Sequence, residues 1–598
     1  MICSLALARS HAEAGRWAEA VEACRAVLTD SPQNLEVLNI LGVALTSSGS
    51  YEDGVAVLTA AVEFDPIYPG PLKNLSIALQ MLGDFDRAVL RLCQLCALDP
   101  ADPAPINHMG QIFLEQGDLE AAARLMQRAA YLAVSDVSYW VSASSVMLHL
   151  GHVEDAASMF GNALALFSDD SYANTFAATF ALRNGDLELA EDFIKKAQIF
   201  DATSHDAAGI ASRICSYRGA SGAVPPSNET ASGLVLRGPF DTISGYAHMG
   251  RRLIQALREQ SVPLNVIGLT GHERWKAEPL HLPVPARALI NIAIPIAVEP
   301  VPGLATVTYS MFEGTRIPLP WARLSDKSDL VIVPTESSRM AWFSQGFPDT
   351  RLRVCPLGVD AEPMARDISP MVLVSDDGCL VSSFRHRFLN VSDLIPRKNL
   401  AGLLRVWLRA TQRSDDVVLI LKTGRGKEKD IKILRDLLTK SEAAVGRRFA
   451  NAGRVLLVNQ MFNEQQMTAL FAAATCYWSM SHGEGWDLPM SKAGAMGLSL
   501  IAPGHSAYLD YLNPSVARIV PSKVVPACQP YTDAPYPPFF GLEWWQPDED
   551  AAVAIVEAIV KGRDVALPDA SRHLMSNFTW SKAVHRLREI LSTEGMIG

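Results

Sequence analysis

The sequence contains no long apolar run, and this absence argues against a chain that crosses a membrane. A membrane-spanning helix needs roughly 18 to 20 consecutive apolar residues. A stretch such as NIAIPIAV, residues 291–298, is long enough only for a buried strand. The first residues, MICSLALARSHAEAGR, also lack the basic leader that precedes the apolar part of a signal peptide. We therefore expect a cytoplasmic protein with no signal peptide and no stable membrane insertion.

An excess of basic charge and a cysteine framework are lacking as well. The formal net charge is -11, whereas proteins that bind nucleic acid normally present a basic face, so we expect no nucleic-acid partner. The nine cysteines are scattered, without the spacing of a secreted disulfide framework. The one close pair, Cys93 and Cys96, has no second ligand pair, and we interpret it as two small residues packed in a helix. No cluster of residues requires a metal or another cofactor.

A regular spacing of glycines runs through the first third of the chain. Six glycines follow one another at intervals of 34 residues: Gly15, Gly49, Gly83, Gly117, Gly151 and Gly185. Five residues after each glycine stands a small residue, and the first three units end in proline. These positions are Ala20, Gly54, Ala88, Ala122, Ala156 and Ala190, with Pro32, Pro66 and Pro100. A fixed period of this length is typical of stacked supersecondary units.

This pattern resembles the tetratricopeptide repeat. In that repeat a glycine relieves crowding at the turn between two helices, the small residue lets the helices approach closely, and proline ends the second helix. The resemblance implies an α-solenoid of six helix pairs over residues 1–204.

A solenoid of helix pairs has a concave face that commonly binds an extended peptide or a partner helix. Polar residues at one position of successive units, or next to it, could form a ladder that bonds the backbone of a protein acceptor. They are Asn39, Lys73, Asn74, Asn107 and His108. The alternative is a merely solvated helix face, and the sequence leaves both interpretations open.

The composition changes after the repeats. The stretch GASGAVPPSNETAS, residues 219–232, has the composition of a linker, and we place the linker at 205–232. Beyond it, apolar runs such as GLVLRG, DLVIVPT, VVLILKTG and LSLIAPG alternate with helical patterns, which predicts parallel sheets wrapped by helices. We expect two Rossmann-like domains, at 233–370 and 371–598. Ligands should bind in the cleft where the carboxyl ends of strands meet helix N-termini.

One motif in the second half is more specific than this alternation. The stretch SHGEGWDLPMSKAGAMG, residues 481–497, is similar to the E-G-F-G-L-P…E-A…G signature of GT-B glycosyltransferases, in particular the large family 4-like group. Other stretches resemble this group in the expected order: GPFDTISGYAHMGR at 238–251, MFEGTRIPLPW at 311–321, PLGVD at 356–360 and DLIPRKNLAGLLRVW at 393–407. The resemblance covers essentially all of 231–598. It implies a GT-B fold and transfer of a sugar from a nucleotide-sugar donor without a metal.

Four residues are the candidates for catalysis. Negative charge builds on the departing phosphate, and fixed cations can stabilise it, which points to Arg397 and Lys398. Glu484 would accept hydrogen bonds from donor-sugar hydroxyls or face the anomeric carbon. The alternative is a structural role, in which its negative charge stabilises the N-terminus of a helix. Glu313, with Arg316 near it, could orient donor or acceptor across the cleft, or the two could form a salt bridge that supports their loop.

Further residues are expected at the donor. Gly245 and Gly485 would let the backbone approach the ligand. The donor-binding candidates are Ser244, Gly245, Lys422, Gly485, Leu488 and Lys492. His482 and His248 are second-rank candidates together with Arg316, because a lone histidine is more often a hydrogen-bonded scaffold residue than a general base.

Lys492 departs from the family pattern. It stands where the signature has a second glutamate, which in the family binds the ribose hydroxyls of the nucleotide. A lysine ammonium only donates hydrogen bonds and cannot replace that glutamate as an acceptor. Asp393 is a second departure, since many relatives have arginine at about that place. Because Glu484, the glycine loop and the Arg397-Lys398 pair are kept together, we interpret the change as an altered donor rather than a lost activity.

The combination of domains resembles bacterial protein glycosyltransferases, including those that bind flagellin through their repeats and modify its Ser or Thr residues. Some of these resemble enzymes that use nonulosonic acids activated as CMP-sugars. A nonulosonic acid carries a carboxylate, and an additional lysine would suit that group. O-linked N-acetylglucosamine transferases share the architecture in outline, but their catalytic-half motifs differ from those quoted above. The expectation is a cytoplasmic bacterial protein glycosyltransferase with flagellin as the leading acceptor. Two alternatives stay open: a glycosyltransferase of surface polysaccharide or lipid-linked glycan synthesis, and a catalytically silent adaptor.

Overall fold

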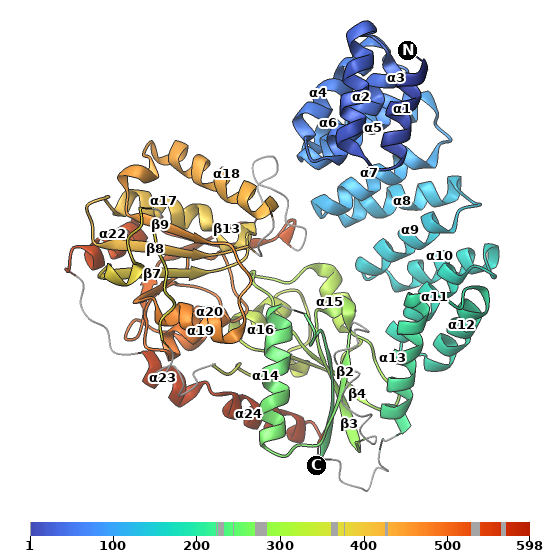
Figure 1. Cartoon of the computed structure of the whole chain (residues 1–598). Helices are drawn as coiled ribbons and strands as arrows, with labels where there is room; N and C mark the ends of the chain where they lie inside the picture. The colour runs from blue at the N-terminus through green and yellow to red at the C-terminus, as the bar shows by residue number, and fades with distance from the viewer. Residues whose placement is uncertain are drawn as a thin grey trace. The chain divides into compact units, whose positions relative to one another are not determined.

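The structure is a computed structural model that describes residues 2–222, 224, 232–242, 244–269, 284–359, 369–375, 377–424, 428–527, 539–563 and 570–597. Helix pairs are followed by two parallel sheets (Figure 1), which confirms the expected α-solenoid and α/β architecture. The chain divides into two compact units, Met1–Ala173 and Asn174–Gly598. Most of the expected linker beyond Gly222, together with Ile243 and Asp360 of two quoted motifs, lies outside the described residues.

The repeats form antiparallel helix pairs as the period predicts. The helices are α1 (Ile2–Glu13), α2 (Trp17–Asp30), α3 (Leu35–Ser47), α4 (Tyr51–Phe64), α5 (Pro69–Leu82), α6 (Phe85–Leu98), α7 (Pro103–Gln116), α8 (Leu119–Leu132), α9 (Val137–His149), α10 (Val153–Leu166), α11 (Ser171–Arg183) and α12 (Leu187–Phe200). The small residues five positions after each glycine are buried between the helices. Each of the first three prolines follows the end of the second helix of its pair, where a missing N–H costs least.

The repeat glycines act through their backbone conformation. All six have a positive φ, between 68° and 88°, in the turn that joins the helices of a pair. At Gly15, Gly49 and Gly83 an added Cβ would meet nothing within 4 Å. Glycine is therefore needed at these turns for the left-handed backbone, and not for relief of crowding as the resemblance suggested.

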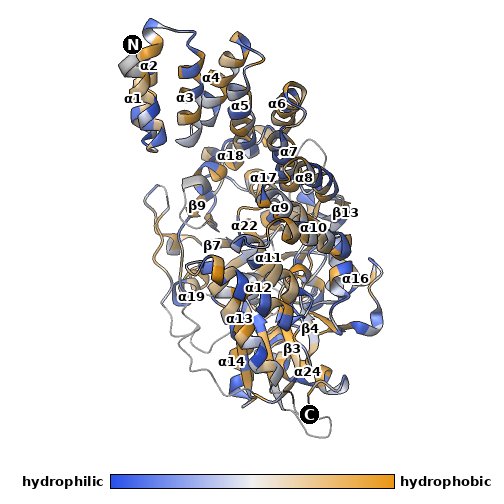
Figure 2. Ribbon diagram, turned by 90° about the vertical axis from the view of Figure 1, so that its right-hand side faces the viewer, coloured by the Kyte–Doolittle hydropathy of each residue, from blue (hydrophilic) through white to orange (hydrophobic). Residues whose placement is uncertain are grey.

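The first sheet has the strand order β2-β1-β3-β4-β5-β6, and all its strands are parallel. They are β1 (Gly233–Gly238), β2 (Leu264–Gly268), β3 (Ala286–Ile292), β4 (Ala305–Tyr309), β5 (Leu330–Val333) and β6 (Leu352–Val354). Apolar residues of these strands belong to two core clusters, because helices cover both sides of the sheet, and the ribbons of β3 and β4 are largely orange in Figure 2. The order reverses between β1 and β3, so this is the topological switch point. Helix α14 (Gly245–Glu259) follows β1 and covers one face, while α15 (Leu319–Ser325) and α16 (Glu336–Phe343) flank β5.

The last repeat helices share their core with the first sheet. Helix α13 spans His205–Gly222, so the first part of the segment expected to be a linker is helical. Its buried residues Ala207, Ile214, Tyr217 and Ala220 recur at helical spacing and pack in one cluster with Val235 of β1 and Leu289 of β3. Small residues that indicated a linker therefore serve close helix-to-sheet packing.

A buried ion cluster lies in the same interface. Arg237 of β1 pairs with Glu299 at 2.8 Å, and both side chains are almost fully buried. Tyr217 of α13 donates a hydrogen bond to Glu299, and Arg213 lies 3.5 Å from the same carboxylate oxygen. Burial alone would raise the pKa of Glu299, but the surrounding arginines lower it, so the carboxylate stays charged. The cluster joins α13 to the sheet by charge as well as by apolar contact.

The second sheet has the order β12-β11-β10-β7-β8-β9, again parallel throughout. Its strands are β7 (His386–Val391), β8 (Val417–Lys422), β9 (Arg454–Val458), β10 (Cys476–Trp478), β11 (Ser499–Pro503) and β12 (Arg518–Val520). Leu389 of β7 pairs with Ile420 of β8 and with Tyr477 of β10. The order reverses between β7 and β10, which makes their carboxyl ends the switch point of this half.

Helices cover both faces of the second sheet. One face packs against α17 (Leu400–Ala410) and α22 (Glu549–Val560), with Trp407 and Trp478 buried in the layer between. The other face packs against α19 (Glu464–Ala472), α20 (Leu488–Ala495) and α23 (Ala570–Asn577). The helix α18 (Glu428–Val445) follows β8, and a separate antiparallel hairpin is formed by β13 (Ser522–Pro526) and β14 (Glu543–Pro547).

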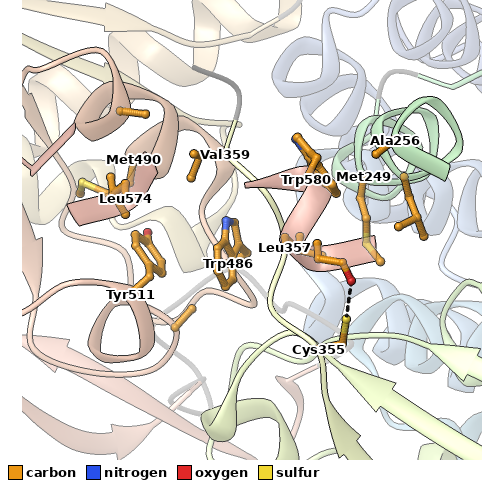
Figure 3. Close-up of a cluster of buried hydrophobic side chains, with 14 of the residues drawn as sticks. Met249, Ala256, Cys355, Leu357, Val359, Trp486, Met490, Tyr511, Leu574 and Trp580 are labelled. Carbon is orange, nitrogen blue, oxygen red and sulfur yellow. Dashed lines mark hydrogen bonds between the residues drawn. The ribbon is translucent and has the colours of Figure 1, made fainter. Parts of the chain in front are cut away.

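The C-terminal helix returns to the first half. Helix α24 (Trp580–Thr593) contacts α14 (Figure 1), and Trp580 lies beside Met249 and Ala256 in Figure 3. Cys355 donates a hydrogen bond from Sγ to the carbonyl of Ala583 over 3.5 Å. The first half is thus completed by residues from the far end of the sequence.

Across the part of the chain that the structure describes, no helix combines the length and the apolar character that a bilayer crossing requires.

Candidate functional site

The candidate site lies at the switch point of the second sheet. The loops after β7 and β10 run side by side there: His482 donates from its backbone N–H to the Arg397 carbonyl over 2.8 Å. Asn399 Nδ2 donates to the Met480 carbonyl over 2.9 Å, and its Oδ1 caps α17 through the Gly402 N–H. Because adjacent strands end at one edge of the sheet, two motifs 86 residues apart in sequence are brought together.

Glu484 is the centre of this site. Its carboxylate forms an ion pair with Arg397 Nη1 at 2.9 Å and accepts hydrogen bonds from Lys398 Nζ at 2.6 Å and from Ser481 Oγ at 2.7 Å, while Arg397 Nη1 donates to the Gly483 carbonyl. Only 4% of the residue is exposed. Burial by itself raises the pKa of Glu484, but the charges of Arg397 and Lys398 and these hydrogen bonds outweigh it and lower the pKa to about 2. Glu484 is therefore ionised at neutral pH and forms ion pairs with both expected cations.

The first half contributes Glu313, from the loop after β4. Its Oε1 lies 3.4 Å from Arg397 Nη2. Burial, with the nearby charge of Glu484, raises the pKa of Glu313, while Arg397 and Lys398 lower it by less. The structure thus brings all four expected catalytic residues together: two cations, one ionised carboxylate and one carboxyl whose pKa is raised.

Two glycines allow the halves to touch at this point. An added Cβ on Gly483 would lie 1.8 Å from the Glu313 carbonyl oxygen, and one on Gly485 would lie 2.6 Å from the Met311 side chain. Only a residue without a Cβ fits at Gly483, since the clashing atom belongs to the backbone. A Cβ on Gly485 would point toward Met311.

Backbone strain is concentrated around Glu484. Among the described residues, four that are not glycine have a positive φ, and three of them surround this site: Asn399 (φ 48°), Asp487 (φ 57°) and Ser506 (φ 46°). Each strained conformation is held by hydrogen bonds, since Asn399 and Asp487 cap helices and Ser506 Oγ accepts from the Glu484 N–H at 3.2 Å. Strain of this kind clusters at functional sites, where packing holds a fixed geometry.

Asp487 is a third carboxyl of the cluster. Its Oδ2 accepts a hydrogen bond from Tyr508 over 2.6 Å, and its Oδ1 accepts from the Met490 N–H at 3.3 Å. Burial and the charge of Glu484 raise the pKa of Asp487 to about 6, despite Lys398 and these hydrogen bonds.

Two buried histidines near Glu484 stack on the tryptophans of β14. His482 stacks on Trp544 at 4.4 Å and lies with Nδ1 2.8 Å from the Trp545 carbonyl. His505 stacks on Trp545 at 5.1 Å and lies with Nε2 3.0 Å from the Ser481 carbonyl. Burial is the first cause that lowers their pKa values, to about 4 for His482 and about 3 for His505. Because both contacts are to carbonyl oxygens, each of these nitrogens must carry the hydrogen and donate.

The remaining donor-binding candidates lie on neighbouring elements. Ser244 and Gly245 are exposed at the N-terminus of α14, where Ser244 Oγ accepts from the Ala247 N–H. Lys422 ends β8, with Nζ 3.4 Å from the Gly424 carbonyl and over the Phe462 ring. Lys492 donates to Thr468 Oγ1 over 3.0 Å and lies over the ring of Phe471. Leu488 packs against the core at the start of α20.

Two second-rank candidates contact other partners. Arg316 is exposed and donates to the Gly541 carbonyl over 3.4 Å, and the ion pair of Glu313 is formed with Arg397. His248 of α14 lies with Nδ1 3.9 Å from Glu464 of α19.

The polar residues of the first unit fall into two groups. Asn74 Nδ2 donates to Asn39 Oδ1 over 2.8 Å, so these two bond to each other. Lys73, Asn107 and His108 line a cavity of about 550 Å³ together with Gln80 and Tyr139. His108 Nε2 lies 2.6 Å from Gln80 Oε1. The Asn107 Oδ1 is buried and has no hydrogen-bond partner in the described part of the chain.

Sequence reasoning missed several residues of the site. Asp487, His505, Ser506 and Tyr508 were not singled out, although GHSAY at 504–508 directly follows a strand of the second series. The rule that carboxyl ends of parallel strands share an edge would have found them. Trp544 and Trp545 belong to an antiparallel hairpin outside the alternation of strand and helix, and no sequence signal places them here.

Comparison with known proteins identifies the repeats. The tetratricopeptide repeat family matches residues 5–69 and 148–207. No curated protein matches the chain.

Solved structures with a similar course of the chain include Anabaena Alr3699/HepE in complex with UDP and glucose, at 13% identity over 60% of this chain and 100% of that chain, with a TM-score of 0.41. A mutant of the Thermobaculum terrenum O-GlcNAc transferase is similar at 13% identity over 99% of this chain and 96% of that chain, with a TM-score of 0.39. YrrB, a TPR protein with an unusual peptide-binding site, matches at 15% identity over 32% of this chain and 100% of that chain, with a TM-score of 0.26.

Proposed function

We propose that this chain is a glycosyltransferase that moves a sugar from a nucleotide-activated donor to Ser or Thr of a protein acceptor. The observation that carries the proposal is the contact of Arg397, Lys398 and Glu484 at the switch point of a doubly wound sheet. Ligands of such sheets bind outside the carboxyl ends of the strands. The two cations would stabilise the charge that develops on the leaving phosphate, which makes a metal-independent transfer our proposal. Glu484 would bind donor-sugar hydroxyls or face the anomeric carbon.

The donor belongs to the proposal as well. We propose a CMP-activated nonulosonic acid, because Lys492 supplies a cation where the family signature has an acceptor. The Lys492 ammonium now bonds to Thr468, and the sugar carboxylate would compete for it as a charged partner.

The acceptor would be recognised by the repeats. The cavity of the first unit offers the Lys73 ammonium, the His108 ring and the buried Asn107 Oδ1, next to apolar side chains such as Leu92 and Leu95. A backbone N–H of an extended segment would satisfy Asn107 Oδ1, whose burial without a partner costs about 1 to 3 kcal/mol. We propose flagellin as the acceptor, glycosylated in the bacterial cytoplasm.

The test is the intact mass of a flagellin co-expressed with this chain in a cell that makes the full set of nucleotide sugars. Wild-type protein should add a sugar-sized mass, and Glu484→Gln should not, although it keeps the size of the side chain. Asn107→Leu should reduce the modification through weaker acceptor binding and leave donor binding unchanged.

Other outcomes separate the rival functions. Retention of the flagellin by residues 1–204 without any mass gain would identify a silent adaptor. A mass gain on a lipid-linked glycan, and none on protein, would identify a transferase of surface glycan synthesis.

A further inference from the structure

Five ionisable side chains meet in a cluster at the switch point, where Glu484 and Asp487 are buried and the Glu313 side chain is 23% exposed. Arg397 and Lys398 carry two positive charges, and Glu313, Glu484 and Asp487 can carry three negative charges. Both cations are already bonded to Glu484, at 2.9 and 2.6 Å. With all five ionised the cluster has one negative charge in excess. The site therefore has no net positive charge to offer an incoming anion.

A nucleotide sugar brings at least one further negative charge on its phosphate. Uncompensated charge in a buried site is costly, and the usual response of a neighbouring carboxyl is to take up a proton. The protein can thus balance the phosphate in one of two ways: by displacing Glu484 from the cations, or by neutralising another carboxylate.

The hydrogen bonds decide which carboxyl is neutralised at least cost. Glu484 accepts hydrogen bonds from Lys398 and Ser481 and forms an ion pair with Arg397, and both oxygens of Asp487 accept one hydrogen bond. Protonation would weaken these contacts. Glu313 has one long ion pair, at 3.4 Å to Arg397, and a hydrogen bond to its own backbone, and its pKa is raised by burial and by Glu484. Of the three carboxyls, Glu313 has the weakest contacts to lose when it takes up a proton.

We propose that binding of a nucleotide sugar at this site is coupled to uptake of a proton by Glu313, which releases Arg397 to pair with the donor phosphate. This inference rests on the function proposed above. The groups that face Glu313 are Arg397 and Lys398 from the loop after β7, Glu484 from the loop after β10, and Tyr246 from α14. Among them, Glu484 is the group whose charge favours the protonated form.

The coupling has a defined sign. A bound phosphate raises the pKa of Glu313, so the complex holds more protons than the free protein and donor do. Donor affinity is then highest at low pH and falls by up to about tenfold per pH unit as the pH rises through the pKa of Glu313 in the complex.

The test is isothermal titration calorimetry of the full chain with nucleotide sugars, in pairs of buffers with different ionisation enthalpies. UDP-glucose, UDP-N-acetylglucosamine, GDP-mannose and CMP-N-acetylneuraminate serve as probes, because none has a phosphate that titrates near neutral pH. The dependence of the observed enthalpy on buffer gives the number of protons taken up. We expect close to one proton for wild type, close to none for Glu313→Gln, and a flat affinity between pH 6 and 8 in that variant. Asp487→Asn serves as the matched variant and should keep the uptake.

The outcomes are distinct. Tight binding of a probe by wild type without proton uptake would overturn the inference and leave the proposed function intact. Unchanged uptake in Glu313→Gln, or uptake lost in Asp487→Asn alone, would overturn the assignment to Glu313. Binding of none of the four probes would count against the proposed function itself. If Glu313→Gln fails to fold, the wild-type proton count and the pH dependence of its affinity still decide whether the coupling exists.

Discussion

Lys398 donates a hydrogen bond to Glu484 over 2.6 Å, from the loop after β7 to the loop after β10. The pair shows that the cations and the carboxylate of the candidate site are partners of one another before any donor binds. Changes at either residue should therefore affect both the stability of the second half and the proposed chemistry, and well-chosen variants separate the two effects.

The first prediction concerns Glu484→Gln. The change leaves Lys398 without its ion-pair partner and Arg397 with only the 3.4 Å pair to Glu313, which should lower the free energy of unfolding by about 3 kcal/mol. Transfer activity should fall at least about 100-fold, because the charge that faces the donor sugar is lost. Ser481→Ala is the control, since it removes a hydroxyl that bonds to Glu484 at 2.7 Å and to the Arg397 and Gly483 carbonyls at 3.1 Å but removes no charge, and it should cost about 1 kcal/mol. Urea unfolding and a transfer assay measure both effects, and equal losses in the two variants would contradict the central role of Glu484.

The second prediction concerns pH. His482 and His505 are buried in the neutral form, with pKa values lowered to about 4 and about 3. The unfolded chain binds their protons below about pH 6.5, so their contribution to stability is complete above that pH and is lost as the pH falls. Each histidine should contribute up to about 1.4 kcal/mol per pH unit to this loss.

Asp487 contributes to the pH dependence of the unfolding free energy with the opposite sign. Its pKa is raised to about 6, so ionisation disfavours the folded state, and its contribution declines as the pH rises toward 6. The comparison of His505→Gln with wild type isolates the histidine: the variant should show a shallower fall of unfolding free energy between pH 6.5 and 4.5. His585→Gln is the matched control, because its side chain is 76% exposed on α24. Parallel pH profiles for wild type and His505→Gln would show that His505 does not titrate as described.

The third prediction concerns Gly483→Ala. Its Cβ would press on the Glu313 carbonyl at 1.8 Å, so the loop after β10 or the loop after β4 must move. Overpacking of this kind typically costs about 1 to 3 kcal/mol, and the displacement should also separate Glu313 from Arg397. Gly161→Ala in α10 is the control, because an added Cβ there meets nothing within 4 Å and alanine is the better helix former. Thermal unfolding should show a lower Tm for Gly483→Ala and an equal or higher one for Gly161→Ala.

The fourth prediction concerns Glu299→Gln. The carboxylate compensates Arg237 and Arg213 in the interface of α13 with the first sheet. Its loss leaves buried guanidinium groups unpaired and should cost about 3 to 5 kcal/mol. Glu191→Gln is the matched change at an exposed site, where the partner Arg218 is 49% exposed, and it should leave the free energy of unfolding nearly unchanged. Similar losses of unfolding free energy in both variants would contradict a buried, mutually dependent cluster.

The sequence predicted those parts of the fold that rest on short-range rules. The 34-residue spacing predicts helix pairs because one turn and one close contact recur in every unit. Alternation of strand and helix predicts the two parallel sheets, and the order of the motifs predicts that Arg397, Lys398 and Glu484 meet at one edge.

Other features depend on how segments far apart in sequence face each other. The contact of Gly483 with Glu313 is set by the approach of the two halves, and neither motif alone contains it. The residues of α13 resemble a linker, since glycine, alanine and serine are common to flexible chains and to tightly packed helices. The role of Trp544 and Trp545 depends on a hairpin that packs its rings on His482 and His505, which no periodicity encodes.

Helix α24 determines where the chain can be divided. It packs on α14 and on Cys355, so the first half consists of residues from about 233 to 359 together with the residues of α24. An exchange of second halves between related chains would have to leave α24 with the first half. A fragment that ends before Trp580 would expose the apolar face of α14, and a fusion attached after α24 would place its cargo next to the first half.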